Sequence, residues 1–368
     1  MHHAKDAKDA KENRSGRLSA LRPPRPLRET IPPFALHSPV VRHEMRQRNM
    51  PPPLLAEPKP PAVRLTNVTK TFGAHTAVNQ LSLSVPAGCT YGFIGPNGSG
   101  KTTTIRTILH IFHPDSGEVE VLGERSTRAA NDRIGYLPEE RGLYKKMTVC
   151  RVLAYYAALK GMKRADAAAE IQKWLAKMGL TEWADKKVEA LSKGMAQKIQ
   201  FIAAVIARPE LLILDEPFSG LDPVNLEVIR SAILELRAAG TTVIFSTHDM
   251  TMAETMCDFI FMIYRGNKVL DGTLASIQQS FGEDTIRVST SGGAELLRSL
   301  PGVELVRDLG HAQELRHRDP QSLLRDLASR TTVRHFEVCK PSLHDIFIRI
   351  AKPDLQELAV PKTTGGGS

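Results

Sequence analysis

Residues 95–102 read GPNGSGKT, a run of glycines, one lysine and one threonine whose chemistry suits a triphosphate. Closely spaced glycines let backbone N–H groups turn toward phosphate oxygens. Lys101 can reach the β- and γ-phosphates, and the Thr102 hydroxyl can ligate Mg²⁺. The spacing fits the phosphate-loop pattern at every specified position, so the sequence predicts that this chain binds a nucleoside triphosphate.

Two carboxylates follow a second apolar run. Residues 211–216 read LLILDE, which predicts a buried strand that ends in Asp215 and Glu216. Beside the phosphate loop, Asp215 can hold the Mg²⁺ shell through water, and Glu216 can polarise the attacking water as a general base. The alternative, a strand that happens to end in acids, is weakened by the phosphate loop upstream.

A third run, LSKGM at residues 191–195, opens an apolar helix predicted over residues 196–207. The Ser192 hydroxyl, the Gly194 N–H and a helix N-terminus can together bind an anion. This pentapeptide alone would be an ordinary helix cap. Its place between the phosphate loop and the later SGLD (residues 219–222) and His248 makes the ordered set much more specific.

The surrounding pattern predicts the elements that position these residues. A short apolar strand over residues 90–94 precedes the loop, and a helix over residues 103–109 follows it, with its N-terminal dipole facing the anion. Apolar strands over 211–214 and 242–245 flank a helix over 224–239 that Asp222 and Pro223 start well. Continuous apolar strands alternating with helices indicate a parallel sheet covered on both faces, and therefore an α/β fold.

The remaining elements complete a two-domain organisation. Strands are expected over 63–68, 81–85 and 118–122, a helix-rich stretch over 148–207, and a hairpin that turns at residues 265–267. Past residue 282, the order strand, helix, two strands, helix, strand follows a split βαβ arrangement, with a last helix over 342–351. Structural packing is the default role of this smaller unit, and regulatory or dimerising use stays open. The expected segments are a tail (1–62), a nucleotide-binding domain (63–282), a small α+β domain (283–352) and a flexible end (353–368).

Composition limits the classes of function. Residues 1–62 hold 12 of the 24 prolines and 12 Lys and Arg against 6 Asp and Glu, so we expect a disordered basic tail. An electrostatic contact of this tail with anionic lipid or nucleic acid is less favoured than a solvated tail or an upstream extension. The rest is nearly balanced, with 37 basic against 34 acidic residues, which argues against nucleic acid. Four scattered cysteines without a CxxC pair indicate reduced thiols.

The ordered motifs resemble the nucleotide-binding domain of ABC transporters over roughly residues 63–280. The resemblance implies a P-loop NTPase with a RecA-like parallel core, antiparallel β and helical subdomains, ATP and Mg²⁺ as ligands, and Phe72 stacked on adenine. It assigns Glu216, His248 and Lys101 to catalysis and Thr102, Asp215 and Glu139 to Mg²⁺; His248 would contact the γ-phosphate, although a lone histidine is more often a packing residue. The nucleotide would contact Phe72, Gly95, Pro96, Asn97, Gly98, Ser99, Gly100, Lys101, Thr102, Thr103, Ser192, Gly194 and Asp222.

Three positions depart from the family pattern. Glu139 stands where a glutamine is usual, and the signature carries Lys193 and Met195 in place of glycine and glutamine. We expect these changes to modify activity without abolishing it. The stretch LPEERGLY at 137–144 and the run SLHDIF at 342–347 look like ATPase subunits of bacterial sodium-exporter-like and multidrug-exporter-like systems.

This resemblance implies an ATPase that dimerises around two ATP molecules, with Ser192 and Gly194 completing the site of the opposing subunit. It would power export through a separate transmembrane permease, at the cytoplasmic face of the inner membrane. No apolar run approaches the ~18 residues that a membrane span needs. The alternatives are an importer ATPase and a non-transport ABC ATPase of ribosomes or DNA, which usually has two cassettes in one chain or long coiled coils.

Overall fold

The computed structural model describes residues 60–125, 130–140, 142–282 and 285–359. The predicted basic tail therefore lies almost entirely outside the described residues, as do the last nine residues of the chain. Among the helices that the structure describes, none is long and apolar enough to cross a bilayer.

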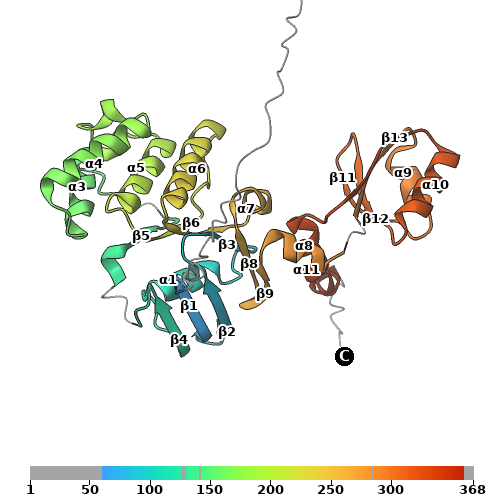
Figure 1. The fold of residues 1–368 in the computed structure, drawn as a ribbon, viewed down its shortest axis with the longest axis horizontal. Helices are drawn as coiled ribbons and strands as arrows, with labels where there is room; N and C mark the ends of the chain where they lie inside the picture. The colour runs from blue at the N-terminus through green and yellow to red at the C-terminus, as the bar shows by residue number, and fades with distance from the viewer. Residues whose placement is uncertain (1–59, 126–129, 141, 283–284, 360–368) are drawn as a thin grey trace, which may run out of the picture. The chain divides into compact units, whose positions relative to one another are not determined.

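A six-stranded sheet in the order β5-β6-β7-β3-β8-β9 forms the centre of the predicted nucleotide-binding domain (Figure 1). Its strands are β5 (Ile134–Leu137), β6 (Leu211–Asp215), β7 (Thr242–Thr247), β3 (Thr90–Ile94), β8 (Phe259–Tyr264) and β9 (Asn267–Gly272). All neighbouring strands pair in parallel except β9, which pairs antiparallel with β8. The predicted parallel sheet and the hairpin at residues 265–267 are both confirmed.

Both faces of this sheet are covered. On β6, Leu212 and Leu214 belong to a core shared with helices, whereas Leu211 and Ile213 belong to a second core that includes Ile105. Alternate side chains of a strand point to opposite faces, so a strand between two covered faces must be apolar throughout. The uninterrupted apolar run of β6 has this cause.

The helices of the predicted nucleotide-binding domain carry side-chain caps at several of their N-termini. Its helices are α1 (Lys101–Ile108), α3 (Val149–Leu159), α4 (Arg164–Lys177), α5 (Lys193–Val205), α6 (Pro223–Ala238), α7 (Met250–Met256) and α8 (Leu274–Ser280), with short 3-10 turns at Asn131–Arg133, Thr181–Trp183 and Val188–Ala190. The Asp222 carboxylate accepts hydrogen bonds from the N–H groups of Val224 and Asn225, so α6 begins as predicted. Helix α5 starts at Lys193, three residues before its predicted start, because Ser192 caps it by accepting from Met195 N.

A three-stranded antiparallel sheet, β2-β1-β4, lies next to the phosphate loop in sequence and carries Phe72. Strands β1 (Val63–Phe72) and β2 (His75–Val85) are longer than predicted, whereas β4 (Ser116–Val121) is close to its expected place. Residues 69–76 lack an apolar alternation, but backbone pairing between β1 and β2 still extends both strands to the turn at Gly73.

Asp115 ties the end of β1 to the connection before β4. Its carboxylate accepts hydrogen bonds from Lys70 Nζ at 2.8 Å, Thr71 Oγ1 at 2.6 Å and Thr71 N at 2.7 Å. Lys70 and the Thr71 donors lower the pKa of Asp115 from its ordinary value of 3.8 to about 2. Because the folded-state pKa is depressed, this carboxylate stabilises the fold above pH 3.8 and loses that effect as the pH falls through about 2.

We therefore expect Asp115→Asn to destabilise the protein at neutral pH by a difference that shrinks steadily as the pH falls toward 2. The measurement is the urea midpoint of both proteins across that range. Asp326→Asn is the matched control, because the Asp326 carboxylate makes no hydrogen bond with the described residues and sits on exposed helix surface. A difference for Asp115→Asn that did not change with pH would contradict the assignment.

The C-terminal unit has the predicted split βαβ order. It contains β10 (Thr285–Thr290), α9 (Gly293–Ser299), β11 (Glu304–Asp308), β12 (Gln313–Arg316), α10 (Pro320–Arg330), β13 (Val333–Cys339) and α11 (Leu343–Ala359). The sheet order is β11-β12-β10-β13, and a separate small core includes Ile286, Leu315 and Leu327. Helix α11 extends past the predicted end at residue 351 and continues through Pro353, which removes one backbone donor without ending the helix.

Candidate nucleotide-binding active site

The phosphate loop connects β3 to α1, and its backbone leaves no room for side chains at two glycines. A Cβ on Gly95 would lie 2.3 Å from Ile263 O, and one on Gly100 would lie 2.4 Å from Ala77 O. Both residues also have positive φ, at 152° and 113°. Only glycine satisfies these positions without moving the backbone, which explains the residue types of the pattern.

Lys101 reaches back across this loop from the first turn of α1. Its Nζ donates to Gly95 O at 2.7 Å and Pro96 O at 3.1 Å, and the residue is only 6% exposed. Burial lowers the pKa of Lys101, and the carboxylates of Glu216, Asp215 and Glu139 oppose that shift. The ammonium therefore lies where a triphosphate bound to the loop needs a cation.

Asp215 is the buried carboxylate at the end of β6. Its Oδ1 accepts from Ser246 Oγ at 2.5 Å and lies 3.3 Å from Thr102 Oγ1. Its Oδ2 is buried and has no hydrogen-bond partner among the described atoms. An orphaned carboxylate oxygen beside a threonine hydroxyl is the donor set that a hard divalent cation prefers, so these residues fit Mg²⁺.

Glu216 occupies a strained backbone position, with φ of 49°. A non-glycine residue in this region costs of order 1 kcal/mol or more and persists only where its surroundings fix it. Here Glu216 N donates to Ser246 Oγ at 3.0 Å. The strain aims the side chain so that Oε1 lies 3.0 Å from His248 Nδ1 and 4.0 Å from Lys101 Nζ.

A cavity of about 420 Å³, the candidate nucleotide cavity, is lined by residues of the phosphate loop and by Glu216. Its lining residues are Phe72, His75, Ala77, Asn97, Gly98, Gly100, Lys101, Thr102, Thr103, Glu139 and Glu216. The Phe72 ring packs edge-on against Phe112 with centroids 5.3 Å apart and remains 45% exposed, so it can stack on a base. A second cavity of about 230 Å³ shares Glu216 and holds His248 with Ser219.

The residues of the predicted signature lie elsewhere. Ser192 caps α5 and is exposed, and Gly194 lies against Asn225, so neither lines the cavity that contains Lys101. The Lys193 ammonium is close enough to Gly220 that a Cβ there would lie 2.5 Å from Nζ. The signature and the SGLD run therefore form one surface, separate from the phosphate loop.

The structure thus brings together one subset of the predicted residues: Lys101, Thr102, Glu139, Asp215, Glu216 and His248. Ser192, Gly194 and Asp222 lie outside the nucleotide cavity, and the Asp222 carboxylate is occupied as the cap of α6. Sequence reasoning missed Ser246, which bonds both acidic residues. Ser246 could have been identified from its position near the end of β7, an apolar strand that the sequence predicts and that pairs with β6.

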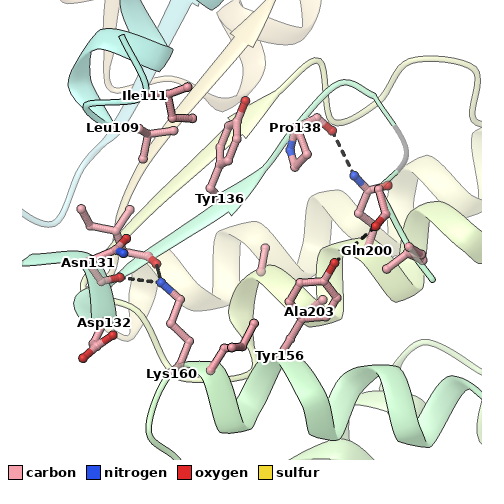
Figure 2. Close-up of a pocket in the computed structure, with 15 residues that line it drawn as sticks. Leu109, Ile111, Asn131, Asp132, Tyr136, Pro138, Tyr156, Lys160, Gln200 and Ala203 are labelled. Atoms are coloured by element: carbon pink, nitrogen blue, oxygen red, sulfur yellow. Dashed lines mark hydrogen bonds between the residues drawn. The ribbon is translucent and has the colours of Figure 1, made fainter. Parts of the chain in front are cut away.

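A larger cleft of about 620 Å³ lies between β5 and the helices α3 and α5 (Figure 2). Leu109, Ile111, Tyr136 and Leu159 give it apolar walls, and Ile111 and Leu159 are exposed. At its rim Gln200 Nε2 donates to Pro138 O and Glu140 O, at 3.2 and 3.1 Å. Residue 139, which lies between them, lines the nucleotide cavity, so one short segment touches both spaces.

Comparison with known proteins agrees with this geometry. Residues 78–219 match the family described as "ABC transporter", and residues 272–351 match "ATP-binding protein DrrA1-3-like, C-terminal domain". The chain is 42% identical over 287 residues to the uncharacterized ABC transporter ATP-binding protein YhaQ of Bacillus subtilis, covering 77% of this chain and 96% of that protein. It is 34% identical over 297 residues to the Nod factor export ATP-binding protein I of Burkholderia lata, covering 79% and 97%.

A solved structure of the ATP-binding subunit of an ABC transporter shares the fold, with a TM-score of 0.57 and 28% identity over 60% of this chain and 93% of that one. The phosphate loop and the two carboxylates of β6 are the site of a nucleotide-hydrolysing protein. The relative YhaQ, which is aligned over almost its full length, is an ABC transporter ATP-binding protein, and this agrees with the site. This chain belongs to the ATP-binding proteins of ABC transporters, which bind and hydrolyse ATP.

Proposed function

We propose that this chain is the ATPase subunit of an exporter, acting as a homodimer around two ATP molecules and driving a separate transmembrane permease. The observation that carries the proposal is the position of Glu216, between His248 at 3.0 Å and Lys101 at 4.0 Å on the wall of the nucleotide cavity. The proposed base Glu216 therefore lies next to a cation, Lys101, and a hydrogen-bonding partner, His248. These are the groups that phosphoryl transfer to water requires.

Each residue has a separate task in this mechanism. The loop N–H groups and Lys101 bind and orient the phosphates, and Phe72 holds the base. Glu216 accepts a proton from the attacking water, and His248 orients the Glu216 carboxylate and contacts the γ-phosphate. When bound, Mg²⁺ would be held by Thr102, Glu139 and, through water, Asp215, and it would neutralise developing charge on the phosphates.

The position of the signature supports a dimer. Ser192 and Gly194 open α5 on a surface away from the cavity of their own chain, and a helix N-terminus favours an anion. A second copy would bring this surface to the γ-phosphate of the first. ATP would then join the two chains, and hydrolysis would remove the bridge and let them separate.

The apolar cleft supports a membrane partner. Exposed apolar side chains around a cleft mark an interaction site. Ile111 and Leu159 line the cleft and are exposed. Tyr155 of the adjoining helix α3 is exposed too, and its ring lies 5.5 Å from the exposed ring of Tyr144. The segment 138–140 joins the cleft to the nucleotide cavity, so movement at one is transmitted to the other. We place the permease here, which would hold the chain at the cytoplasmic face of the inner membrane.

Export as the direction is supported by one likeness, the relative whose name records Nod factor export. Nucleic acid as a partner is disfavoured by the near balance of charge outside the first 62 residues.

The test is recovery of the full-length protein from membranes in its native host. We expect the chain, tagged and carrying Glu216→Gln to prolong the ATP-bound dimer, to co-purify with one polytopic membrane protein. Leu159→Glu, which puts a charge into the cleft wall, should abolish this recovery without changing ATP binding. Recovery with ribosomes or DNA in place of a membrane protein would contradict the proposal, and a permease that mediates uptake would contradict export alone.

A further inference from the structure

Helix α7 begins at Met250, two residues after His248, so its position sets the position of that histidine. Asp249 caps the helix, accepting from Met252 N at 3.0 Å, and Asp249 N donates to Thr247 Oγ1 at 3.0 Å. The far end of the helix packs on β3, where a Cβ on Gly92 would lie 2.5 Å from Cys257 Sγ. The inner side of α7 is therefore fixed against the strand that leads into the phosphate loop.

The C-terminal segment holds another side of this helix. Leu343 and Ile346, both fully buried, share a core with Ala253 of α7, with Ile94 of β3 and with Ile277 of α8. Leu343 N donates to Glu254 Oε1 of α7 at 2.5 Å. Residues 89 positions apart in sequence are thus joined on the helix that follows His248, the proposed γ-phosphate contact.

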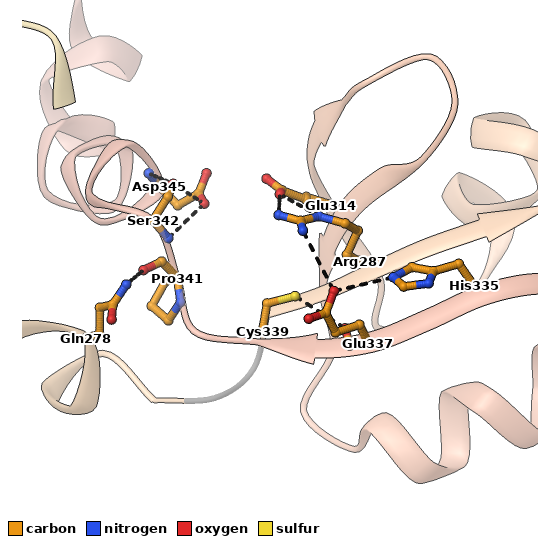
Figure 3. A network of polar contacts seen from close by, with 9 residues as sticks. All are labelled: Gln278, Arg287, Glu314, His335, Glu337, Cys339, Pro341, Ser342 and Asp345. Atoms are coloured by element: carbon orange, nitrogen blue, oxygen red, sulfur yellow. Dashed lines mark hydrogen bonds and ion pairs between the residues drawn. The ribbon is translucent and has the colours of Figure 1, made fainter. Parts of the chain in front are cut away.

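Glu254 completes the cap of α11. Ser342 and Asp345 satisfy each other's backbone donors, with Asp345 N bonding Ser342 Oγ at 3.1 Å and Ser342 N bonding Asp345 Oδ2 at 3.3 Å (Figure 3). The N–H of Leu343 has no partner within the helix and bonds Glu254. A carboxylate at a helix N-terminus is also favoured by the helix dipole.

This position is otherwise unfavourable for a carboxylate. Burial raises the pKa of Glu254, the carboxylates of Asp345 and Glu314 raise it further, and the Leu343 N–H opposes them. Glu314 is itself paired with Arg287 (Figure 3). Among the described groups that shift the pKa of Glu254, none is a cation. A polar residue without charge would fill this site at less cost in desolvation.

We propose that Glu254 is a positioning residue for ATP hydrolysis: through it, residues 341–347 hold α7, and hence His248, in register with Glu216. The proposal rests on the role of His248 given under the proposed function. If Glu254 has this role, the C-terminal domain modulates turnover. A movement of α11 would displace α7, because one hydrogen bond and a shared apolar core join the two helices.

The same segment has a second anchor that does not touch α7, and this supplies the control. Gln278 Nε2, on α8, donates to Pro341 O at 2.9 Å (Figure 3). If residues 341–347 only attach the C-terminal domain, loss of either anchor should have the same effect. If they position His248, only the Glu254 anchor should affect turnover.

The experiment compares full-length Glu254→Ala, Glu254→Gln and Gln278→Ala in steady-state ATPase assays. We expect Glu254→Ala to lower kcat about tenfold with KM for ATP within about twofold, as for an interaction realised in the transition state. Glu254→Gln, whose amide oxygen still accepts from Leu343 N, should keep at least about half the rate, and Gln278→Ala should stay within about twofold. Circular dichroism melting checks that each variant is folded.

The decisive step repeats Glu254→Ala in a His248→Ala background. A residue that acts through His248 has no further effect once His248 is gone. Equal losses in Glu254→Ala and Gln278→Ala, or a full additional loss in the double variant, would overturn the positioning role. An unchanged kcat in His248→Ala alone would instead refute the proposed role of His248.

Backbone hydrogen exchange decides the matter if His248→Ala turnover falls below detection. Exchange over residues 247–256 should accelerate in Glu254→Ala and stay unchanged in Gln278→Ala. Equal exchange in both variants would overturn the proposal.

Discussion

Replacing Glu216 with glutamine is expected to lower kcat for ATP at least about 100-fold, because loss of a positioned general base costs roughly 10² to 10⁴ in rate. The amide can still bond His248 across the 3.0 Å contact, so the geometry of the site should survive. ATP binding should be retained or tightened, since one of three carboxylates facing Lys101 is removed. Phosphate release gives the rate, and calorimetry gives the affinity.

Glu235→Gln is the matched control for this variant. Glu235 is a surface carboxylate on α6 paired with Lys177, remote from the nucleotide cavity. Its rate should stay within about twofold of the wild type, as for most surface substitutions. Normal turnover by Glu216→Gln would show that another group activates the water.

The second large effect is expected when the phosphate loop and the signature, the two proposed halves of the ATP site, are each disabled by a separate substitution. Lys101→Met removes the buried cation, leaving Glu139, Asp215 and Glu216 opposite the triphosphate. We expect ATP affinity to fall at least about 100-fold, or about 3 kcal/mol at 1.4 kcal/mol per tenfold. Ser192→Arg should leave ATP binding by the phosphate loop intact but abolish turnover, because Ser192 lies on the other surface.

Mixing these two inactive variants should restore activity. In a mixed dimer one site combines both substitutions, and the other combines an intact phosphate loop with an intact signature. At equal amounts about a quarter of the wild-type rate is expected, since half the dimers are mixed and each has one working site of two. No recovery, with mixed dimers demonstrated by mass, would contradict a site shared between chains.

The structure gives physical meaning to the three departures from the family pattern. Met195 is partly buried and packs against the core of the helical subdomain, so here an apolar side chain has a structural task. Lys193 is exposed beside Gly220, and its charge lies on the surface that we propose contacts the nucleotide of a second subunit. Glu139 lines the nucleotide cavity, where its charge opposes the lowered pKa of Lys101.

The sequence by itself determined the chemistry and much of the fold. Phosphate-loop residues, the Asp215–Glu216 pair and the apolar strands are local patterns, because backbone geometry and strand burial restrict which residue types can occur there. For the same reason the C-terminal element order was predictable from its alternation of strands and helices.

Only the tertiary structure decided which residues meet. The bond of Ser246 to both Asp215 and Glu216 depends on two strands becoming neighbours, which neither strand encodes alone. The contact of Leu343 with Glu254, across nearly 90 residues of sequence, depends on how whole elements pack. Such pairings arise from burial shared between distant segments, so spacing along the chain carries no record of them.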